Sequence, residues 1–508
     1  MRRFKSLHLA MLTLGSLCLN SAYASDTLHS LSDTEMSATT GQALMSLSYI
    51  APNDTNSNSS VNGNVGFYKL GLEAELELNA NIKNLQLGCG GVNGVGGCDI
   101  DIKNLSLSGL NDGVVASGAN AGSPTYANGR ASTSAKITNP FIEFAIKNPG
   151  SASQREIAGF RLSAEAIEGL LSAGLTNGST PTTTDGIQSL SGYMQIAATT
   201  GHVYTKESTF GVGDSNCLPR ATDCQSIGGK VSTLLGDRYF RSLPNDSTTT
   251  GITVPSLKVG FNLPAFTVKG TRQTQAVAQN VSASIPWLPI APAGTCPTGT
   301  YATACATANA QISGVNYGND LLYVLLTKNG NDTTWPGDCV FWGLGCITNA
   351  KFGMGNGSAI TDLNVNITFK QALSMFHNIP LRGTGGYLAL QNQALRWPGA
   401  NTDDIAQRGW WMSFAEPVQL GYLEAANKVD ISAVLPQVAA FATNALLADA
   451  PIDVSGLGDT WSALTNQTLR KTLQIDVGSS PAAQLTLENQ QLKSQYLTTN
   501  CYGSLKFC

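Results

Sequence analysis

The arrangement of the cysteines constrains the fold of this chain most. Ten of its eleven cysteines form five close pairs, with only six or eight residues between the two members of each pair. An even number of closely paired cysteines predicts local disulfides in a chain that folds in an oxidising compartment. The predicted pairs are Cys89 with Cys98, Cys217 with Cys224, Cys296 with Cys305, Cys339 with Cys346, and Cys501 with Cys508.

A metal site or a redox centre fits this cysteine pattern less well than disulfides do. The chain contains no C-x-x-C motif, which zinc sites and redox-active dithiols commonly use. Downstream of the N-terminal leader, the only histidines are His29, His202 and His377. We therefore expect structural disulfides, no metal and no cofactor.

The N-terminus predicts export into such an oxidising compartment. Arg2, Arg3 and Lys5 precede a short apolar run, and Ala22-Tyr23-Ala24 follows as an A-x-A cleavage site. These three parts make a secretory signal peptide over residues 1–24, so Cys18 would be removed with it. The run is too short for a comfortable membrane span. We expect a protein at the cell surface, at the outer membrane or in the periplasm, without a transmembrane span.

Charge makes nucleic acid an improbable partner. Without Arg2, Arg3 and Lys5, 27 basic and 34 acidic side chains remain, a net charge of −7, and no basic tract stands out. Charged residues make up 13% of the chain, about half the usual share, and Gly, Ser, Thr and Asn take their place. This balance is typical of β-rich extracellular proteins, whose turns use Gly and Asn.

The first cysteine pair can be tested against strand pairing. Residues of one parity share a face of a strand, so a bridge between Cys89 and Cys98 fixes the register of the flanking strands. That register brings apolar residues face to face along the whole hairpin. The predicted pairs are Leu87 with Ile100 and Leu85 with Ile102.

Period-two hydrophobicity predicts an all-β fold with a few short helices. In residues 67–78, apolar side chains at the even positions alternate with mostly polar or small residues, as in a half-buried strand. Residues 81–87 recur as residues 101–107, which fits either adjacent strands of one sheet or coils of a β-solenoid. We expect a β-sandwich or β-solenoid with disulfide-stapled hairpins.

Three helices and three regions are predicted along the mature chain. Ser32-x-x-Glu35 is a capping-box pattern that opens a short helix, which Gly41 can end. Ser163 is placed to begin a helix that Gly174 would end, and residues 431–450 form an apolar stretch that fits a buried helix. A Pro-rich stretch at residues 285–300 is a candidate boundary. The predicted regions are an N-terminal β-rich domain at 25–176, a middle β segment at 187–284, and a mixed, mainly β domain at 300–508.

Motifs for catalysis are absent from the sequence. There is no G-x-S-x-G nucleophile elbow and no P-loop. A Ser-His-Asp arrangement would need His202 or His377, and each fits a packed or surface histidine better. Sequence spacing cannot identify a carboxylate pair of a glycosidase. We assign no catalytic residue and expect a protein that is not an enzyme.

Two aromatic features are candidates for contact with a partner. The predicted Cys339–Cys346 bridge would close a loop that carries Phe341, Trp342 and Leu344, and a rigid apolar tip lowers the cost of binding. The alternative is that these side chains pack into the core. Trp410-Trp411-Met412 reads as a strand with one Trp on each face.

Three segments resemble a known group of exported proteins. Residues 31–43 carry D-x-E-M-x-x-x-x-G-Q-A, from Asp33 to Ala43, just after the signal peptide. This motif, with residues 137–144 and 409–414, resembles the filament (Fil) group of exported Gram-negative proteins. The resemblance implies a role in the cell envelope linked to pilus assembly or fimbriae, with no catalytic residues to carry over.

We expect a non-enzymatic envelope protein that takes part in filament assembly or adhesion, with other envelope or filament proteins as partners. Export, low charge, the β pattern and the local disulfides favour this function. The alternatives are an exported glycan-directed enzyme and a carrier of an apolar ligand, both on a β-rich scaffold.

Overall fold

The computed structural model describes residues 45–110, 134–210, 227–233, 236–242, 252–290, 296–312, 338–339, 346–347, 357–384, 386–448, 452–458, 474–495 and 500. The chain divides into two compact units, Met1–Ser46 and Leu47–Cys508, and only Met45 and Ser46 of the first unit are described. The predicted signal peptide and the predicted short helix that follows it therefore lie outside the described residues. The described part is mostly β-strand, as the sequence predicts.

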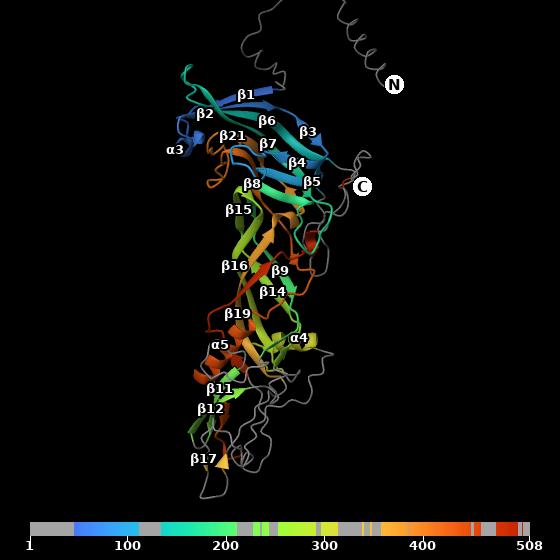
Figure 1. Ribbon diagram of the computed structural model, residues 1–508, viewed down its shortest axis with the longest axis vertical. Coiled ribbons are helices and arrows are strands. Elements are labelled where there is room, and N and C mark those ends of the chain that lie inside the picture. The colour runs from blue at the N-terminus through green and yellow to red at the C-terminus, as the bar shows by residue number, and fades with distance from the viewer. Residues whose placement is uncertain are drawn as a thin grey trace, which may run out of the picture. The chain divides into compact units, whose positions relative to one another are not determined.

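The larger of two main sheets has twelve strands (Figure 1). Its main path is β1-β2-β6-β7-β21-β22-β8-β5-β4, with β3, β15 and β20 paired beside it. These strands are β1 (Met45–Ile50), β2 (Val65–Leu72), β3 (Glu75–Leu78), β4 (Ala80–Leu87), β5 (Ile100–Ser108), β6 (Ala135–Lys147), β7 (Glu156–Ala173), β8 (Gly186–Ile196), β15 (Phe266–Gln273), β20 (Asn378–Leu381), β21 (Tyr387–Gln391) and β22 (Gly409–Val418).

Strand β7 organises the twelve-stranded sheet because it is long and pairs on both edges. One edge pairs first with β6 and then with β5, and the other pairs with β21 and β20. The β5–β7 pairing closes β7, β21, β22, β8 and β5 into a ring of strands. At Gly169 a Cβ atom would lie 2.6 Å from the Cβ of Ala135, so this close approach requires glycine.

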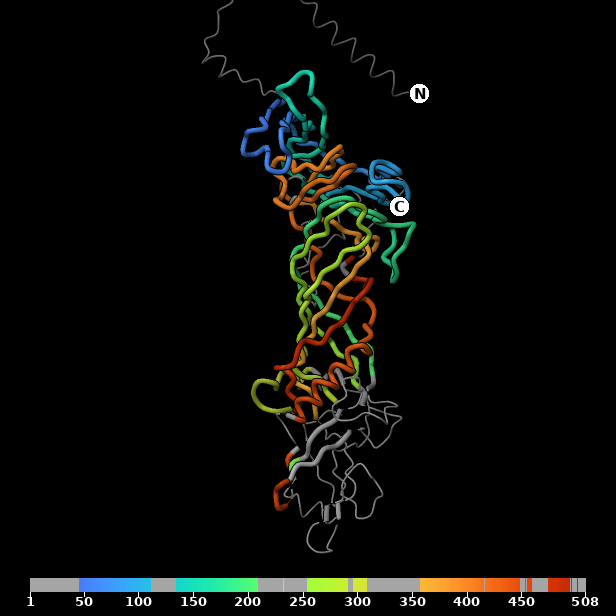
Figure 2. Tube along the Cα trace, turned by 60° about the vertical axis from the view of Figure 1, so that its left-hand side comes forward, coloured from blue at the N-terminus to red at the C-terminus, as the bar shows by residue number. Residues whose placement is uncertain are grey.

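The second main sheet has seven strands in the order β23-β9-β14-β16-β19-β25, with β26 also paired to β19. The long strands β16 and β19 run side by side, as the yellow-green and orange tubes show (Figure 2). These strands are β9 (Thr199–Tyr204), β14 (Lys258–Leu263), β16 (Gln275–Pro289), β19 (Ala359–Ala372), β23 (Leu423–Glu424), β25 (Gln474–Asp476) and β26 (Ala483–Glu488).

Short strands and helices complete the described elements. Helix α5 (Leu435–Ala448) fills most of the apolar stretch, residues 431–450, for which the sequence predicts a buried helix. Among the described residues no helix is both long and apolar enough to cross a membrane. The remaining elements are β10 (Ser208–Phe210), β11 (Ile227–Thr233), β12 (Gly236–Ser242), β13 (Ile252–Val254), β17 (Asp338–Cys339), β18 (Cys346–Ile347), β24 (Ile452–Val454), α3 (Ser59–Asn62), α4 (Ala302–Ile312), α5 (Leu435–Ala448), η1 (Thr55–Ser57), η4 (Leu373–Met375) and η5 (Lys493–Gln495).

The first predicted hairpin is confirmed in both bridge and register. Cys89 and Cys98 form a disulfide, and β4 pairs antiparallel with β5. Leu87 lies opposite Ile100 and Leu85 opposite Ile102, as the sequence predicts. The twenty-residue repeat therefore belongs to adjacent antiparallel strands, which was one of the two alternatives, rather than to coils of a solenoid.

One predicted helix is wrong. The segment that begins at Ser163 and ends before Gly174 is part of the extended strand β7. Ile167, Leu170 and Leu171 have the spacing of a helix face, but the backbone of this segment pairs with neighbouring strands on both edges. Tertiary pairing outweighs local helix propensity here.

The prediction of a half-buried strand over residues 67–78 needs two corrections. The segment forms two strands, β2 and β3, rather than one. In β2 the side chains of Val65 and Phe67 are buried, whereas Tyr68 and Leu70 are substantially exposed. The even side of the strand, where the apolar alternation is strongest, is therefore the side that lacks a cover.

Candidate apolar binding site

Two rows of apolar side chains cross one side of the twelve-stranded sheet. Residues directly opposite each other in paired strands present their side chains on the same side. The first row runs over β2, β6, β7, β21 and β22 and consists of Leu70, Ile142, Leu162, Leu388 and Met412. The second row runs over the same strands and consists of Tyr68, Phe144, Phe160, Leu390 and Trp410. We call these ten residues the apolar side.

The apolar side is uncovered over β2, β6 and part of β7. Leu70 is 40% exposed, Ile142 39% and Phe144 39%. Leu388, Met412 and Trp410, toward the other end of the rows, are partly buried against the main hydrophobic core. A continuous apolar surface on paired strands is unusual for a side that faces water.

The opposite side of the same strands carries the charged groups. Lys69, Glu143 and Arg161 lie opposite one another across β2, β6 and β7. Arg161 Nε lies 2.6 Å from Glu143 Oε2, and Arg161 Nη2 donates a 2.8 Å hydrogen bond to the carbonyl of Pro398. Burial raises the pKa of Glu143, and the charge of Arg161 opposes that rise. The side with Lys69, Glu143 and Arg161, which we call the polar side, is thus covered by residues 392–408, while the apolar side is exposed.

Residues 392–408 cover the polar side with a core of their own. Trp397 is fully buried there and packs against Phe67, with ring centroids 5.6 Å apart. The carboxylate of Asp404 accepts hydrogen bonds from the Tyr387 hydroxyl at 2.9 Å and the Trp411 indole at 3.0 Å. Burial raises the pKa of Asp404, although these donors lower it. The segment that joins β21 to β22 is therefore held firmly on one side of the sheet.

A pocket of about 500 Å³ opens beside the apolar side. Leu162, Leu388 and Met412 belong both to the first row and to the pocket lining. Most of the other lining side chains are aliphatic and come from β3, β5, β6, β7 and β20 to β22. They include Leu76, Leu78, Leu107, Ile137, Ile167, Leu171, Leu381 and Val418. The arrangement can hold an apolar group and has the size of a small-molecule site.

The two histidines considered for catalysis are both buried. His202 Nδ1 lies 2.8 Å from the Tyr422 hydroxyl, and its Nε2 lies 3.5 Å from Glu424 Oε1. Burial, together with the charge of Lys258, lowers the pKa of His202. His377 Nδ1 lies 2.8 Å from the Ala173 carbonyl. Neither histidine lines the pocket.

A second predicted disulfide, Cys296–Cys305, is also present. Strands β17 and β18 place Cys339 opposite Cys346, but the side chains of this pair are outside the described residues. Cys217, Cys224, Cys501 and Cys508 also lie outside the described residues, as do the candidate contact residues Phe341, Trp342 and Leu344. Those predictions remain predictions. Within the described ranges, no group of three or more His, Cys, Asp or Glu side chains is placed to hold a metal ion.

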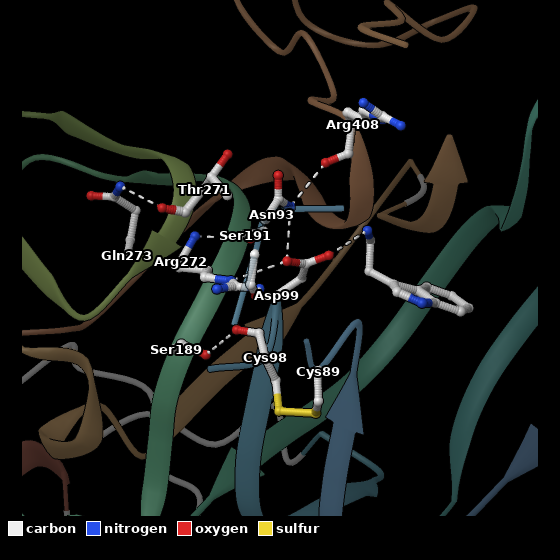
Figure 3. A network of polar contacts seen from close by, with 12 residues as sticks. Cys89, Asn93, Cys98, Asp99, Ser189, Ser191, Thr271, Arg272, Gln273 and Arg408 are labelled. Carbon is white, nitrogen blue, oxygen red and sulfur yellow. Dashed lines mark hydrogen bonds and ion pairs between the residues drawn. A yellow bond between two sulfur atoms is a disulfide. The ribbon is translucent and has the colours of Figure 1, made fainter. Parts of the chain in front are cut away.

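The sequence does not predict the polar contacts that the buried carboxylate of Asp99 makes beside the Cys89–Cys98 bridge. We call this set of contacts the Asp99 junction. Asp99 accepts hydrogen bonds from Asn93 Nδ2 at 2.8 Å and from the Trp410 backbone N–H at 3.1 Å, and Arg272 Nε lies 3.2 Å away (Figure 3). The Asn93 amide also donates to the Arg408 carbonyl. The Asp99 carboxylate thereby joins the tip of the β4–β5 hairpin to β15 and β22.

The described geometry defines the site as an exposed apolar surface on paired strands with an adjoining pocket. No protein family, no curated protein and no solved structure matches this chain.

Proposed function

We propose that this chain is a non-enzymatic, exported component of the cell envelope that binds other envelope or filament proteins. The observation that carries the proposal is the apolar side. Five of its ten side chains, on three neighbouring strands, keep more than a third of their surface exposed: Tyr68, Leu70, Ile142, Phe144 and Leu162. Contiguous exposed apolar patches mark interaction sites in soluble proteins.

The placement of the Fil-like segments supports a role in filaments. Residues 137–144 lie in β6 and supply Ile142 and Phe144 to the apolar side. Residues 409–414 lie in β22 and supply Trp410 and Met412. Two segments that resemble filament proteins thus contribute four of the ten side chains of the proposed binding surface. We therefore propose pilus or fimbrial assembly, or adhesion, as the process served.

A glycan-directed enzyme has less support from the described site. Glycoside hydrolysis generally requires two carboxyl groups that flank the scissile bond. Glu416 is the only acidic residue among those described as lining the pocket, and its carboxylate accepts a hydrogen bond from the Thr384 hydroxyl. One carboxylate at a largely aliphatic pocket favours binding over hydrolysis.

Complementation of a deletion strain tests this function. Deletion should reduce surface filaments or adhesion, and the unaltered gene should restore them. Phe144→Asp should fail to restore them, because it places a charge in the middle of the apolar side. Val95→Asp is the matched control, since Val95 is 92% exposed at the tip of the β4–β5 hairpin and outside the apolar side.

Either of two results would contradict the proposed function. One is normal filaments and adhesion in the deletion strain. The other is full complementation by Phe144→Asp at the same protein level as the unaltered chain.

A further inference from the structure

We propose that the pocket beside the apolar side binds one free straight-chain fatty acid, with its chain inside and its carboxylate at the rim. This inference goes beyond the proposed function, because the occupant is a small amphiphile and not an envelope protein. It rests on the walls, the extent and the rim of the pocket.

The walls select an aliphatic chain. Leucine, isoleucine, valine, proline and methionine side chains dominate the lining, and only Tyr387 and Phe414 are aromatic. Aromatic ligands are usually held by stacking on flat rings, which this lining mostly lacks. A flexible methylene chain gains from contact with aliphatic walls by the removal of its surface from water.

The extent of the pocket suits a long, narrow ligand. Its lining includes residues of β3, β6, β7, β21 and β22, which are successive neighbours in the sheet. Four strand spacings of about 4.8 Å span about 19 Å along the sheet. A volume of about 500 Å³ spread along such a path fits one extended chain better than a compact ring system.

Charge is confined to one part of the pocket. Arg382 and Glu416 are the only charged residues in the described lining, and both are exposed. Glu416 lies beside the turn that follows Arg382, since the Thr384 hydroxyl donates a 3.1 Å hydrogen bond to Glu416 Oε1. A guanidinium at the rim matches the carboxylate of a fatty acid in geometry and charge. The rim thus carries one guanidinium and one carboxylate, and the guanidinium is the group that would pair with the carboxylate of a single-chain amphiphile held in the aliphatic interior.

Fluorescence titration with cis-parinaric acid, a straight-chain fatty acid, tests the inference on the purified mature protein. Saturated fatty acids of increasing length then compete with this probe. Competitor affinity should rise roughly fourfold per methylene until the chain fills the pocket, and then level off.

Two variants on the same strand separate the pocket from the rest of the apolar surface. Leu162→Asp places a carboxylate in the pocket and should weaken binding at least tenfold. Leu162 is 43% exposed, so the fold should tolerate this change. Ile157→Asp is the matched control, because Ile157 is an exposed residue of β7 that does not line the pocket. Arg382→Gln should weaken binding several-fold, and the effect should shrink at high salt.

The inference fails if no fatty acid binds, if affinity is independent of chain length, or if Leu162→Asp and Ile157→Asp weaken binding equally. It also fails if the protein binds fatty-acid-free vesicles but no dissolved fatty acid. If Leu162→Asp loses fatty-acid binding and only Phe144→Asp fails to complement the deletion, fatty-acid binding and the proposed envelope function are two separable roles. Normal complementation by Phe144→Asp would overturn only the proposed function.

Discussion

At the scale of single residues, Asp99 makes the most concentrated set of polar contacts in the first hairpin. Its carboxylate is buried and meets a side-chain amide, a backbone N–H and a guanidinium from three separate segments. Removal of one partner from a buried charged network leaves the other groups unpaired.

We predict that Asp99→Ala lowers the free energy of unfolding by about 3 kcal/mol, because Arg272 and the Asn93 amide lose a buried acceptor. Chemical denaturation of the purified protein measures this change. Glu488→Ala is the control, since the pair of Glu488 with Lys370 is half exposed and should contribute at most about 1 kcal/mol. Equal effects of the two substitutions would contradict the assignment.

His377 should make stability depend on pH. Burial lowers the pKa of its imidazole, while the Ala173 carbonyl and the charge of Asp185 raise it. The folded protein therefore resists protonation that the unfolded chain accepts near pH 6.5. Stability should fall as pH drops below about 6.5, because the unfolded state then binds more protons.

Denaturation midpoints between about pH 7.5 and pH 5 test this expectation. The fall should be shallower in His377→Gln than in the unaltered protein. An identical pH dependence in the two proteins would show that His377 does not titrate as its burial implies.

At the scale of elements, the β4–β5 hairpin shows where sequence reasoning succeeds. The bridge between Cys89 and Cys98 fixed the register, and apolar residues of the same parity as the cysteine in each strand then lay opposite one another. Strand β7 shows where it fails. Ser163, Ile167 and Leu171 have helical spacing, yet β7 pairs with β5 and β6 on one edge and with β20 and β21 on the other. Strands β20 and β21 come from residues more than two hundred positions away in the chain. No local signal contains that pairing.

The bridge at the hairpin tip should stabilise the protein measurably. Joint substitution of Cys89 and Cys98 by serine should lower the free energy of unfolding by about 2.5 kcal/mol, the chain-entropy value for a loop this short. Denaturation under non-reducing conditions measures the difference. Amide exchange should accelerate around Asp99, which follows Cys98 directly. A change below about 0.5 kcal/mol would show that the Asp99 junction alone holds the tip.

At the scale of the whole molecule, the candidate site depends on which sheet faces are covered. The alternation in β2 shows that one side is more apolar, and the simple expectation buries that side. Instead residues 392–408 cover the side with Lys69, Glu143 and Arg161, and the apolar side at Tyr68 and Leu70 remains exposed. The sequence cannot assign that cover, because it comes from a segment more than two hundred residues away.

The apolar side is proposed to contact another envelope protein in the cell. Site-specific photo-crosslinking in living cells would detect this contact, with a benzophenone amino acid at position 144 and, as the control, at position 95. We predict a crosslink from position 144 to an envelope or filament protein and none from position 95. The absence of any protein crosslink at position 144, or the same crosslinks from both positions, would contradict the account.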